Sequence, residues 1–189
     1  MSRLLILYGT TNGHTRKIAR VLSDTLGEDG FLCDVIDADC VPPELGASAY
    51  DGVLVAASIH AGGYQRAVKR WVRAHVGQLN LVPSAFVSVC LGVLERRPEA
   101  QAEVREIMQR FLRASGWQPT VTKTVGGALL YTQYGWLTRW FMKRIVAKAG
   151  GDTDTSRDYE YTDWDDLRAF ARAFARKTMT IGQAIGALP

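Results

Sequence analysis

The sequence predicts a single α/β domain in which a parallel β-sheet is covered by helices on both sides. Short runs of consecutive apolar residues recur along the chain, as in strands that are buried on both faces. Between them lie stretches whose apolar residues recur every three to four positions, as on one face of an amphipathic helix. The length of 189 residues suits one such domain and is short for two.

Five segments have the length and the apolar character of buried strands. The first and third are continuous apolar runs apart from Arg3, the second and fourth are mainly apolar, and the fifth is placed by its position after a long amphipathic helix. The predicted strands are Arg3–Tyr8, Phe31–Ile36, Val53–Ala57, Ala85–Cys90 and a segment within Val121–Leu130.

Four helices are predicted from apolar residues that share one helical face. The first begins at Thr15, the second carries Val68 to Val76, and the third opens at Pro98. The last starts with Thr162 and has Asp165 three residues on, the spacing of a capping box.

About thirty residues between the fifth strand and the last helix (131–161) do not fit this alternation. An insert of that length in a compact domain is usually functional or has structure of its own. On a helix, Trp136–Ala149 would present two apolar faces separated by cations, so it would need an apolar neighbour besides the domain itself. We expect one domain over residues 1–178 that contains this insert, followed by a tail over 179–189.

Charge is unevenly distributed in a chain whose formal net charge is +4. No Asp or Glu occurs from Gly52 to Leu94 or from Ile107 to Gly151, although both stretches carry several Lys and Arg. Such asymmetry suggests a face that meets an anionic partner, either nucleic acid, anionic lipid or an acidic substrate, and solvated basic helix faces are the plainer interpretation.

Three cysteines without pairing or metal-ligand spacing argue against a disulfide scaffold and a zinc ribbon, so we expect a reducing compartment and no metal. The start of the chain does not resemble a signal peptide, and no apolar run approaches the roughly 20 residues of a membrane-spanning helix.

The clearest motif lies between the first strand and the first helix, where Gly9 is followed by hydroxyl and amide side chains. Hydroxyls and backbone N–H groups at a helix N-terminus can bind a phosphate without a cation. The segment lacks the endings of a nucleoside-triphosphatase P-loop and of a dinucleotide-binding loop. The same residue types also suit any tight strand-to-helix turn. The candidate residues are Thr10, Thr11, Asn12, Gly13, His14 and Thr15.

Two further loops begin where the third and fourth strands end. In an open α/β sheet, ligands bind beyond the carboxyl ends of the strands. Both loops offer small residues between which a flat ring could lie, namely Ser58, Ile59 and His60 in one and Cys90, Leu91 and Gly92 in the other. A phosphate-binding loop and two walls for a ring are what flavin mononucleotide (FMN) requires.

Four stretches resemble the quinone-dependent protoporphyrinogen oxidases, a flavodoxin-like family of bacterial haem synthesis. They are LILYGTTNGHTRKIA, VLVAASIHAGGY, PSAFVSVCLGV and, most specifically, GGALLYTQYGWLTRWFMKRIVAKAGGDTDTSRDYEYTDW. The resemblance covers roughly residues 2–177. It implies a doubly wound five-stranded parallel sheet in the order 2-1-3-4-5 with a long insert near the fifth strand.

The resemblance places the FMN phosphate on residues 10–15 and the ring near Ser58, Ile59, His60, Cys90, Leu91 and Gly92. Asp152, Thr153 and Asp154, returning from the insert, would complete the rim. It also implies oxidation of protoporphyrinogen IX to protoporphyrin IX, with menaquinone or ubiquinone as the electron acceptor. No catalytic side chain is assigned, because the flavin supplies the redox chemistry.

The insert is the expected substrate or membrane contact, through Trp136, Arg139, Trp140, Lys143, Arg144 and Lys148. Cations beside aromatic residues suit an anionic lipid surface, so we expect a cytoplasmic protein bound peripherally to the inner face of the membrane. Nucleic acid is not an expected partner. The alternatives are a flavodoxin-type electron carrier, an NAD(P)H:quinone reductase and a flavin-free regulatory or nucleic-acid-binding module.

Overall fold

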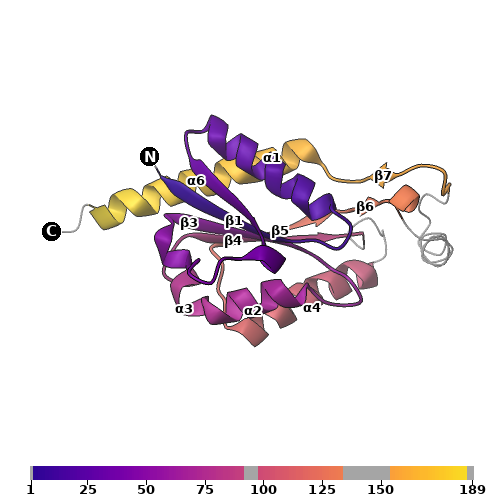
Figure 1. The fold of residues 1–189 in the computed structure, drawn as a ribbon, viewed down its shortest axis with the longest axis horizontal. Coiled ribbons are helices and arrows are strands. Elements are labelled where there is room, and N and C mark those ends of the chain that lie inside the picture. The colour runs from indigo at the N-terminus through magenta and orange to yellow at the C-terminus, as the bar shows by residue number, and fades with distance from the viewer. Residues whose placement is uncertain (1, 92–97, 134–153, 187–189) are drawn as a thin grey trace.

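A five-stranded parallel sheet lies between two layers of helices in the computed structural model, which describes residues 2–91, 98–133 and 154–186 (Figure 1). The sheet order is β2-β1-β3-β4-β5, which confirms the predicted doubly wound topology. The strands are β1 (Arg3–Gly9), β2 (Leu32–Asp37), β3 (Gly52–Ser58), β4 (Ser84–Cys90) and β5 (Val121–Gly126). Each predicted strand is observed within a few residues of its expected bounds.

The central strands carry apolar side chains on both faces because helices cover the sheet on both sides. In β1, Leu4 and Ile6 pack on one side and Leu5 and Leu7 on the other, and all four are fully buried. Burying a side chain of this size contributes roughly 1.5–3 kcal/mol. The continuous apolar runs of the sequence therefore follow from double-sided burial.

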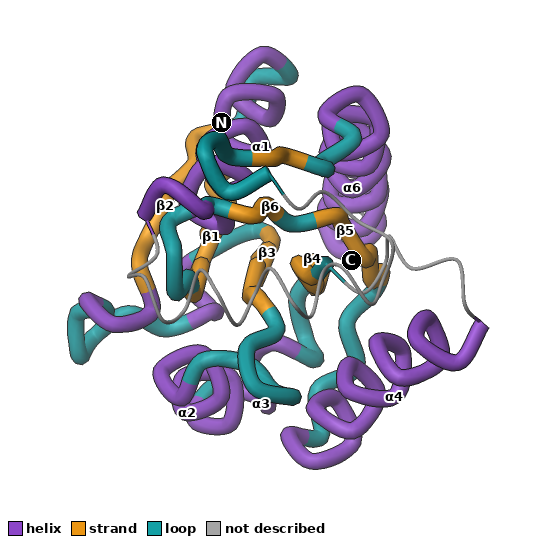
Figure 2. Tube along the Cα trace, turned by 90° about the vertical axis from the view of Figure 1, so that its right-hand side faces the viewer, coloured by secondary structure: helices purple, strands orange, loops and turns teal. Residues whose placement is uncertain are grey.

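Helices α1 (His14–Glu28) and α6 (Trp164–Gly186) cover one face of the sheet. Helices α2 (Arg66–Ala74), α3 (Val76–Leu79) and α4 (Pro98–Ser115) cover the other. Figure 2 looks onto the carboxyl ends of the strands with these two layers on opposite sides. Short 3-10 turns at Ala38–Cys40 and Ala47–Ala49 join β2 to β3.

Two helix boundaries differ from the prediction. The single helix expected through Val76 is two helices that meet at His75, whose backbone leaves helical geometry (φ −116°, ψ 14°) just before the poor helix former Gly77. The last helix is capped by Asp163, whose carboxylate accepts a hydrogen bond from the N–H of Asp166 at 3.0 Å. The predicted cap Thr162 is not available, because its hydroxyl donates to the carbonyl of Gly126 at 2.7 Å.

The chain returns from the insert in close contact with the end of β5. A side chain at Gly126 would overlap the carbonyl of Tyr161, so only glycine permits this approach. The N–H of Tyr161 donates to the carbonyl of Gly127, and the N–H of Gly127 donates to that of Cys90. The returning segment is thus hydrogen-bonded to Gly127, just beyond the end of β5, and Gly127 in turn is hydrogen-bonded to the end of β4.

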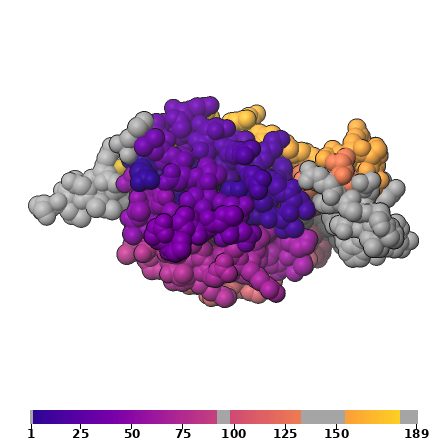
Figure 3. All heavy atoms as spheres, in the orientation of Figure 1, coloured from indigo at the N-terminus to yellow at the C-terminus, as the bar shows by residue number. Residues whose placement is uncertain are grey.

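Two short strands, β6 (Ala128–Leu129) and β7 (Tyr159–Glu160), pair antiparallel at the base of the insert, and a 3-10 turn (Tyr131–Gln133) follows β6. In Figure 3 the orange residues after β6 project from the body at the end where the parallel strands finish. Residues 134–153, which contain the predicted substrate or membrane contacts, lie outside the described residues. Helix α6 crosses the expected boundary at residue 178, and the division into domain and tail stays a prediction. Of the helices that the structure describes, none has the length and apolar character needed to cross a membrane.

Candidate functional site

A cavity of about 180 Å³ opens at the carboxyl ends of β1, β3 and β4, where the three predicted loops meet. These loops are distant in the sequence, and the parallel sheet brings them to one edge. The predicted residues that line the cavity are Thr10, Thr11, Asn12, His14, Thr15, Ser58, Ile59, His60, Cys90 and Leu91.

The loop after β1 leads into the N-terminus of α1 at this cavity. Gly13 precedes α1 with a left-handed backbone (φ 84°), which glycine adopts at little cost. Its N–H donates to Thr10 Oγ1 at 2.9 Å, which shapes the loop. The first N–H groups of an α-helix have no acceptor within the helix, so those of α1 are available to an anion.

Thr15 carries a hydroxyl that is buried without a partner. The residue is 1% exposed and lines the cavity, and its Oγ1 makes no hydrogen bond. An unsatisfied buried hydroxyl is costly unless a ligand provides its partner. Within the described part of the chain, the other such oxygen is Oε1 of Gln65.

Gln65 connects the first loop to the end of β3. Its Nε2 donates to Ser58 Oγ at 2.8 Å and to Thr11 Oγ1 at 3.2 Å. Both hydroxyl groups belong to residues that line the cavity. Gln65 was not among the predicted site residues, because a polar residue just before a helix has many possible partners.

The remaining walls are mainly apolar or backbone. Ile59 and Cys90 line two sides, and Gly127 and Ala128 contribute a third from the segment after β5. Beyond Ile59 the chain reverses in a tight turn in which His60 and Gly63 exchange backbone hydrogen bonds of 2.8 and 3.2 Å. Such walls suit a flat, largely apolar ring.

His14 joins the loop after β1 (residues 10–15, the phosphate-type loop) to the segment that returns from the insert. Its Nε2 lies 2.7 Å from Thr162 Oγ1. Because the single hydroxyl proton of Thr162 is donated to the carbonyl of Gly126, Nε2 of His14 must be the donor to Thr162. The other ring nitrogen, Nδ1, faces the carboxylate of Glu160 at 3.8 Å.

Glu160 is held by two further groups. Lys17 Nζ lies 2.7 Å from one carboxylate oxygen, and Trp164 Nε1 donates to the other at 2.8 Å. Burial opposes ionisation of Glu160, but these hydrogen bonds outweigh it, so its pKa lies below the ordinary value. The pKa of His14 is also lowered, because burial of the ring outweighs the attraction of Glu160 for the proton. The neutral ring with its proton on Nε2 is therefore favoured near neutral pH.

Of the described residues that were predicted to bind FMN, Gly13 and Asp154 do not line the cavity, although Gly13 shapes the loop. Gly92, Asp152 and Thr153 lie outside the described residues, and their role stays a prediction. Asp154 is exposed and accepts hydrogen bonds from the N–H and hydroxyl of Ser156, so the structure places it in a local turn rather than at the cavity. Gly127, Ala128 and Val89 line the cavity and were not predicted. Among the described residues, no group of His, Cys, Asp and Glu is arranged to hold a metal ion.

Comparison with known proteins gives consistent results. A family model described as a flavodoxin domain matches residues 5–156. Protoporphyrinogen IX dehydrogenase [quinone] from Escherichia coli K12 is 38% identical over 177 residues, which cover 93% of this chain and 96% of that protein. The protein of the same name from Leishmania major is 33% identical over 180 residues, covering 95% of this chain and 77% of the relative.

Solved flavodoxins share the fold at low sequence identity. Oxidised flavodoxin 1 from Bacillus cereus has a TM-score of 0.55 at 16% identity and covers 93% of this chain and 98% of that one. An identity this low bears on the fold alone, and it agrees with the observed sheet order.

The buried ring of His14 makes a testable contribution to the pH dependence of stability. Unfolded histidine gains a proton as the pH falls through about 6.5, whereas the buried ring resists protonation. The free energy of unfolding therefore falls as the pH drops from about 6.5 through the lower folded pKa. When the flavin-free His14→Gln variant is unfolded with urea at a series of pH values, its free energy of unfolding should not show this fall.

A second variant tests how the charge of Glu160 affects the protonation of His14. Glu160→Gln removes the charge that favours a protonated His14, so the part of the loss that comes from His14 should begin at the same pH and extend further down, whereas the loss that Glu160 itself contributes at lower pH should disappear. If His14→Gln has the same pH dependence as the unsubstituted protein between about pH 7 and 5, the argument from burial is wrong.

Proposed function

The chain belongs to the flavodoxin-domain family and, within it, groups with the quinone-dependent protoporphyrinogen IX dehydrogenases; on that premise we propose that it oxidises protoporphyrinogen IX to protoporphyrin IX with bound FMN and passes the electrons to a quinone. The substrate loses electrons and protons in repeated two-electron steps, and each quinone accepts two electrons and two protons to become a quinol. The observation that carries the flavin assignment is the buried, unpartnered hydroxyl of Thr15 beside the N-terminus of α1.

The residues of the cavity fit FMN at both ends. At one end, Thr10, Thr11 and Thr15 offer hydroxyl groups beside the N-terminus of α1, where a dianionic phosphate is stabilised. At the other end, Ile59 and Cys90 provide walls for the ring. Bound there, FMN supplies two-electron oxidation and reduction.

The chain itself contributes binding, orientation and exclusion of water. Gln65 holds the phosphate loop and the β3 loop at a fixed separation through Thr11 and Ser58. The hydrogen bond of His14 to Thr162 holds the base of the insert against the same loop. The protein thus positions the reactive edge of the ring, and no side chain is required to carry electrons.

The electron acceptor is proposed to be menaquinone or ubiquinone at the cytoplasmic face of the membrane. The relatives' names specify a quinone, and these two are apolar molecules that reside in the bilayer. The sequence from Trp136 to Lys148 supports a membrane contact through four cations, Arg139, Lys143, Arg144 and Lys148, together with Trp136 and Trp140.

Replacing Thr15 by Val should weaken FMN binding by about ten- to a hundredfold, because a hydrogen bond to a charged group contributes roughly 1.5–3 kcal/mol. Stability of the flavin-free protein should not fall, since the hydroxyl has no partner to lose. Fluorescence titration of the flavin-free protein with FMN measures the affinity.

Thr25 provides a matched control in the same helix. Its hydroxyl is also buried but donates to the carbonyl of Val21 at 2.8 Å, far along α1 from the cavity. Thr25→Val should keep the FMN affinity. Equal affinities of Thr15→Val and the unsubstituted protein would place the phosphate elsewhere.

Anaerobic mixing tests the proposed reaction directly. Adding protoporphyrinogen IX to the yellow FMN-loaded protein should bleach the flavin absorbance, and adding a quinone should restore it with appearance of porphyrin fluorescence. An electron carrier would not be bleached by the porphyrinogen, and a nicotinamide-dependent reductase would be bleached by NAD(P)H instead. Either of these two results would overturn the proposal.

The membrane contact has a separate test. Replacing Arg139, Lys143, Arg144 and Lys148 by Gln should abolish sedimentation with anionic vesicles at low salt, since each basic residue near such a surface contributes about 1 kcal/mol. FMN content should be unchanged. Vesicles of neutral lipid serve as the control and should bind neither protein. Undiminished binding of the variant to anionic vesicles would exclude these residues as the contact.

A further inference from the structure

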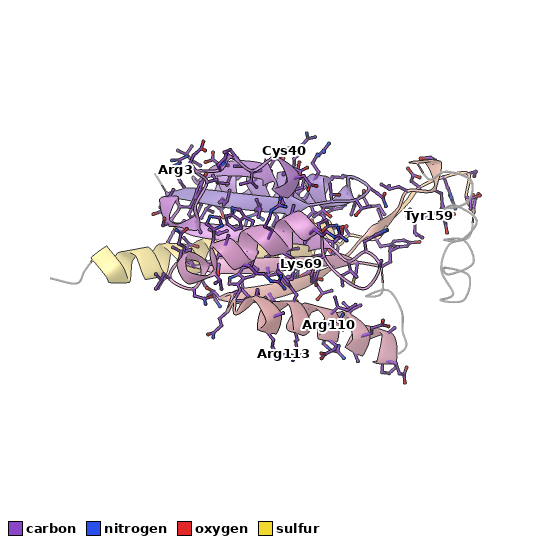
Figure 4. The ribbon with its side chains drawn as sticks, turned by 60° about the horizontal axis from the view of Figure 1, so that its bottom comes forward. Arg3, Cys40, Lys69, Arg110, Arg113 and Tyr159 are labelled. Carbon is purple, nitrogen blue, oxygen red and sulfur yellow. The ribbon has the colours of Figure 1, made fainter. Side chains whose placement is uncertain are left out.

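A second cavity of about 170 Å³ lies between α2 and α4, on the helix layer opposite α1 and α6. Its floor is apolar and buried, formed by Tyr64, Ile107 and Phe111. Three cations line it, Lys69 and Arg73 from α2 and Arg110 from α4, and none of the described residues that line it is acidic. Figure 4 shows Lys69 and Arg110 on this helix layer. We call this cavity the basic groove.

The cations of the basic groove have no acidic partner among the described residues. In that part of the chain, no carboxylate lies within ion-pair distance of Lys69, Arg73 or Arg110. The nearby Arg113 differs, because Glu106 lies 2.6 Å from it. The groove thus combines an apolar floor with cations available to an anion.

The basic groove is adjacent to the proposed FMN cavity at the carboxyl ends of β1, β3 and β4, which we call the flavin-type cavity. The turn from His60 to Gly63 separates them, with Ile59 and His60 lining one cavity and Gly62 and Gly63 the other. The residues of this turn thus contribute to the walls of both cavities. Arg110 Nη2 donates to the carbonyl of Gly62 at 3.1 Å, which anchors this shared wall to α4.

The backbone of this turn is conformationally unusual. Ala61 and Gly62 both have positive φ, 48° and 74°, the combination of a type I′ turn. Alanine adopts this conformation at a cost, so contacts must hold the turn in place. The bond from Arg110 is one such contact, and the guanidinium has further N–H donors for an anion.

We propose that the basic groove binds a propionate carboxylate of the tetrapyrrole substrate, an inference that rests on the function proposed above. The propionates extend from one edge of the macrocycle, so a ring placed over the flavin carries them beyond the immediate wall of its cavity. The groove is smaller than the roughly 300–1,000 Å³ pockets that enclose whole ligands, and it suits a substituent rather than the macrocycle.

The chemistry of the groove fits this occupant. Lys69 and Arg73 can pair with a carboxylate while the aliphatic part of the propionate lies on Phe111 and Tyr64. Exposed Glu103, one helical turn before Ile107 on α4, does not line the groove. Arg110 then connects the carboxylate site to the wall of the flavin-type cavity, so binding orients the ring.

The test compares two double variants of the FMN-loaded protein with equal charge. Lys69→Gln with Arg73→Gln removes groove cations without touching the Arg110 contact. Arg66→Gln with Arg70→Gln removes two exposed cations of the same helix that do not line the groove and have no ion pair among the described residues. Steady-state turnover of protoporphyrinogen IX and equilibrium binding of protoporphyrin IX and its dimethyl ester are measured for each.

The groove variant should raise the KM for protoporphyrinogen on the order of tenfold with little change in kcat, as expected for the loss of two partly exposed charge pairs. Its preference for the diacid over the dimethyl ester should fall by the same factor, with unchanged FMN content. The control variant should behave as the unsubstituted protein.

Three results would overturn the proposal. One is an unchanged KM and an unchanged diacid preference in the groove variant while the unsubstituted protein turns over. Another is an equal effect of both variants, which would indicate the overall charge. The third is a groove variant that no longer sediments with anionic vesicles but still prefers the diacid to the dimethyl ester. This result would make the groove a lipid headgroup site. Absence of turnover in the unsubstituted protein would overturn the proposed function itself, and this inference with it.

Discussion

Burial of the central strands on both faces constrains where this protein can do chemistry. Every residue of β1 from Leu4 to Leu7 is fully buried, and buried polar side chains along the strands, such as Ser84 and Ser88, are hydrogen-bonded within the protein. Polar groups available to a ligand therefore gather where the strands end. Because the strands are parallel, their loops meet at one edge, and both the flavin-type cavity and the basic groove lie around those loops.

The same edge is completed by a part of the chain that is remote in sequence. Gly126 allows Tyr161 to lie against the end of β5, which brings Thr162 within reach of His14. The resulting chain of hydrogen bonds runs from the ring of His14 through the hydroxyl of Thr162 to the carbonyl of Gly126. The base of the insert and the phosphate-type loop are thereby coupled, although residues 14 and 162 are far apart in the chain.

Local patterns in the sequence are sufficient to predict the strands and the loops, whereas the order of the strands is implied by the family resemblance. Apolar runs identify buried strands, and the position of ligand sites at the carboxyl ends follows from the topology. The sequence is not sufficient for contacts that depend on tertiary packing. The spacing to Asp165 predicts Thr162 as a helix cap. In the structure the hydroxyl of Thr162 donates to the carbonyl of Gly126 instead, and Asp163 caps the helix. The bridging contacts of Gln65 escape prediction for the same reason.

Only the structure shows where the basic side chains of this protein lie together. The sequence shows acid-free stretches and a pI of about 9.1, but it does not show which cations share a surface. Lys123 lies in one of these stretches and yet is 2.6 Å from Asp166, so it is neutralised, whereas Lys69 and Arg110 line one groove with no carboxylate partner among the described residues. At physiological salt, an exposed charge acts over a Debye length of about 8 Å. An anionic substrate therefore responds to the arrangement of cations beside the flavin-type cavity, and not to the net charge of the protein.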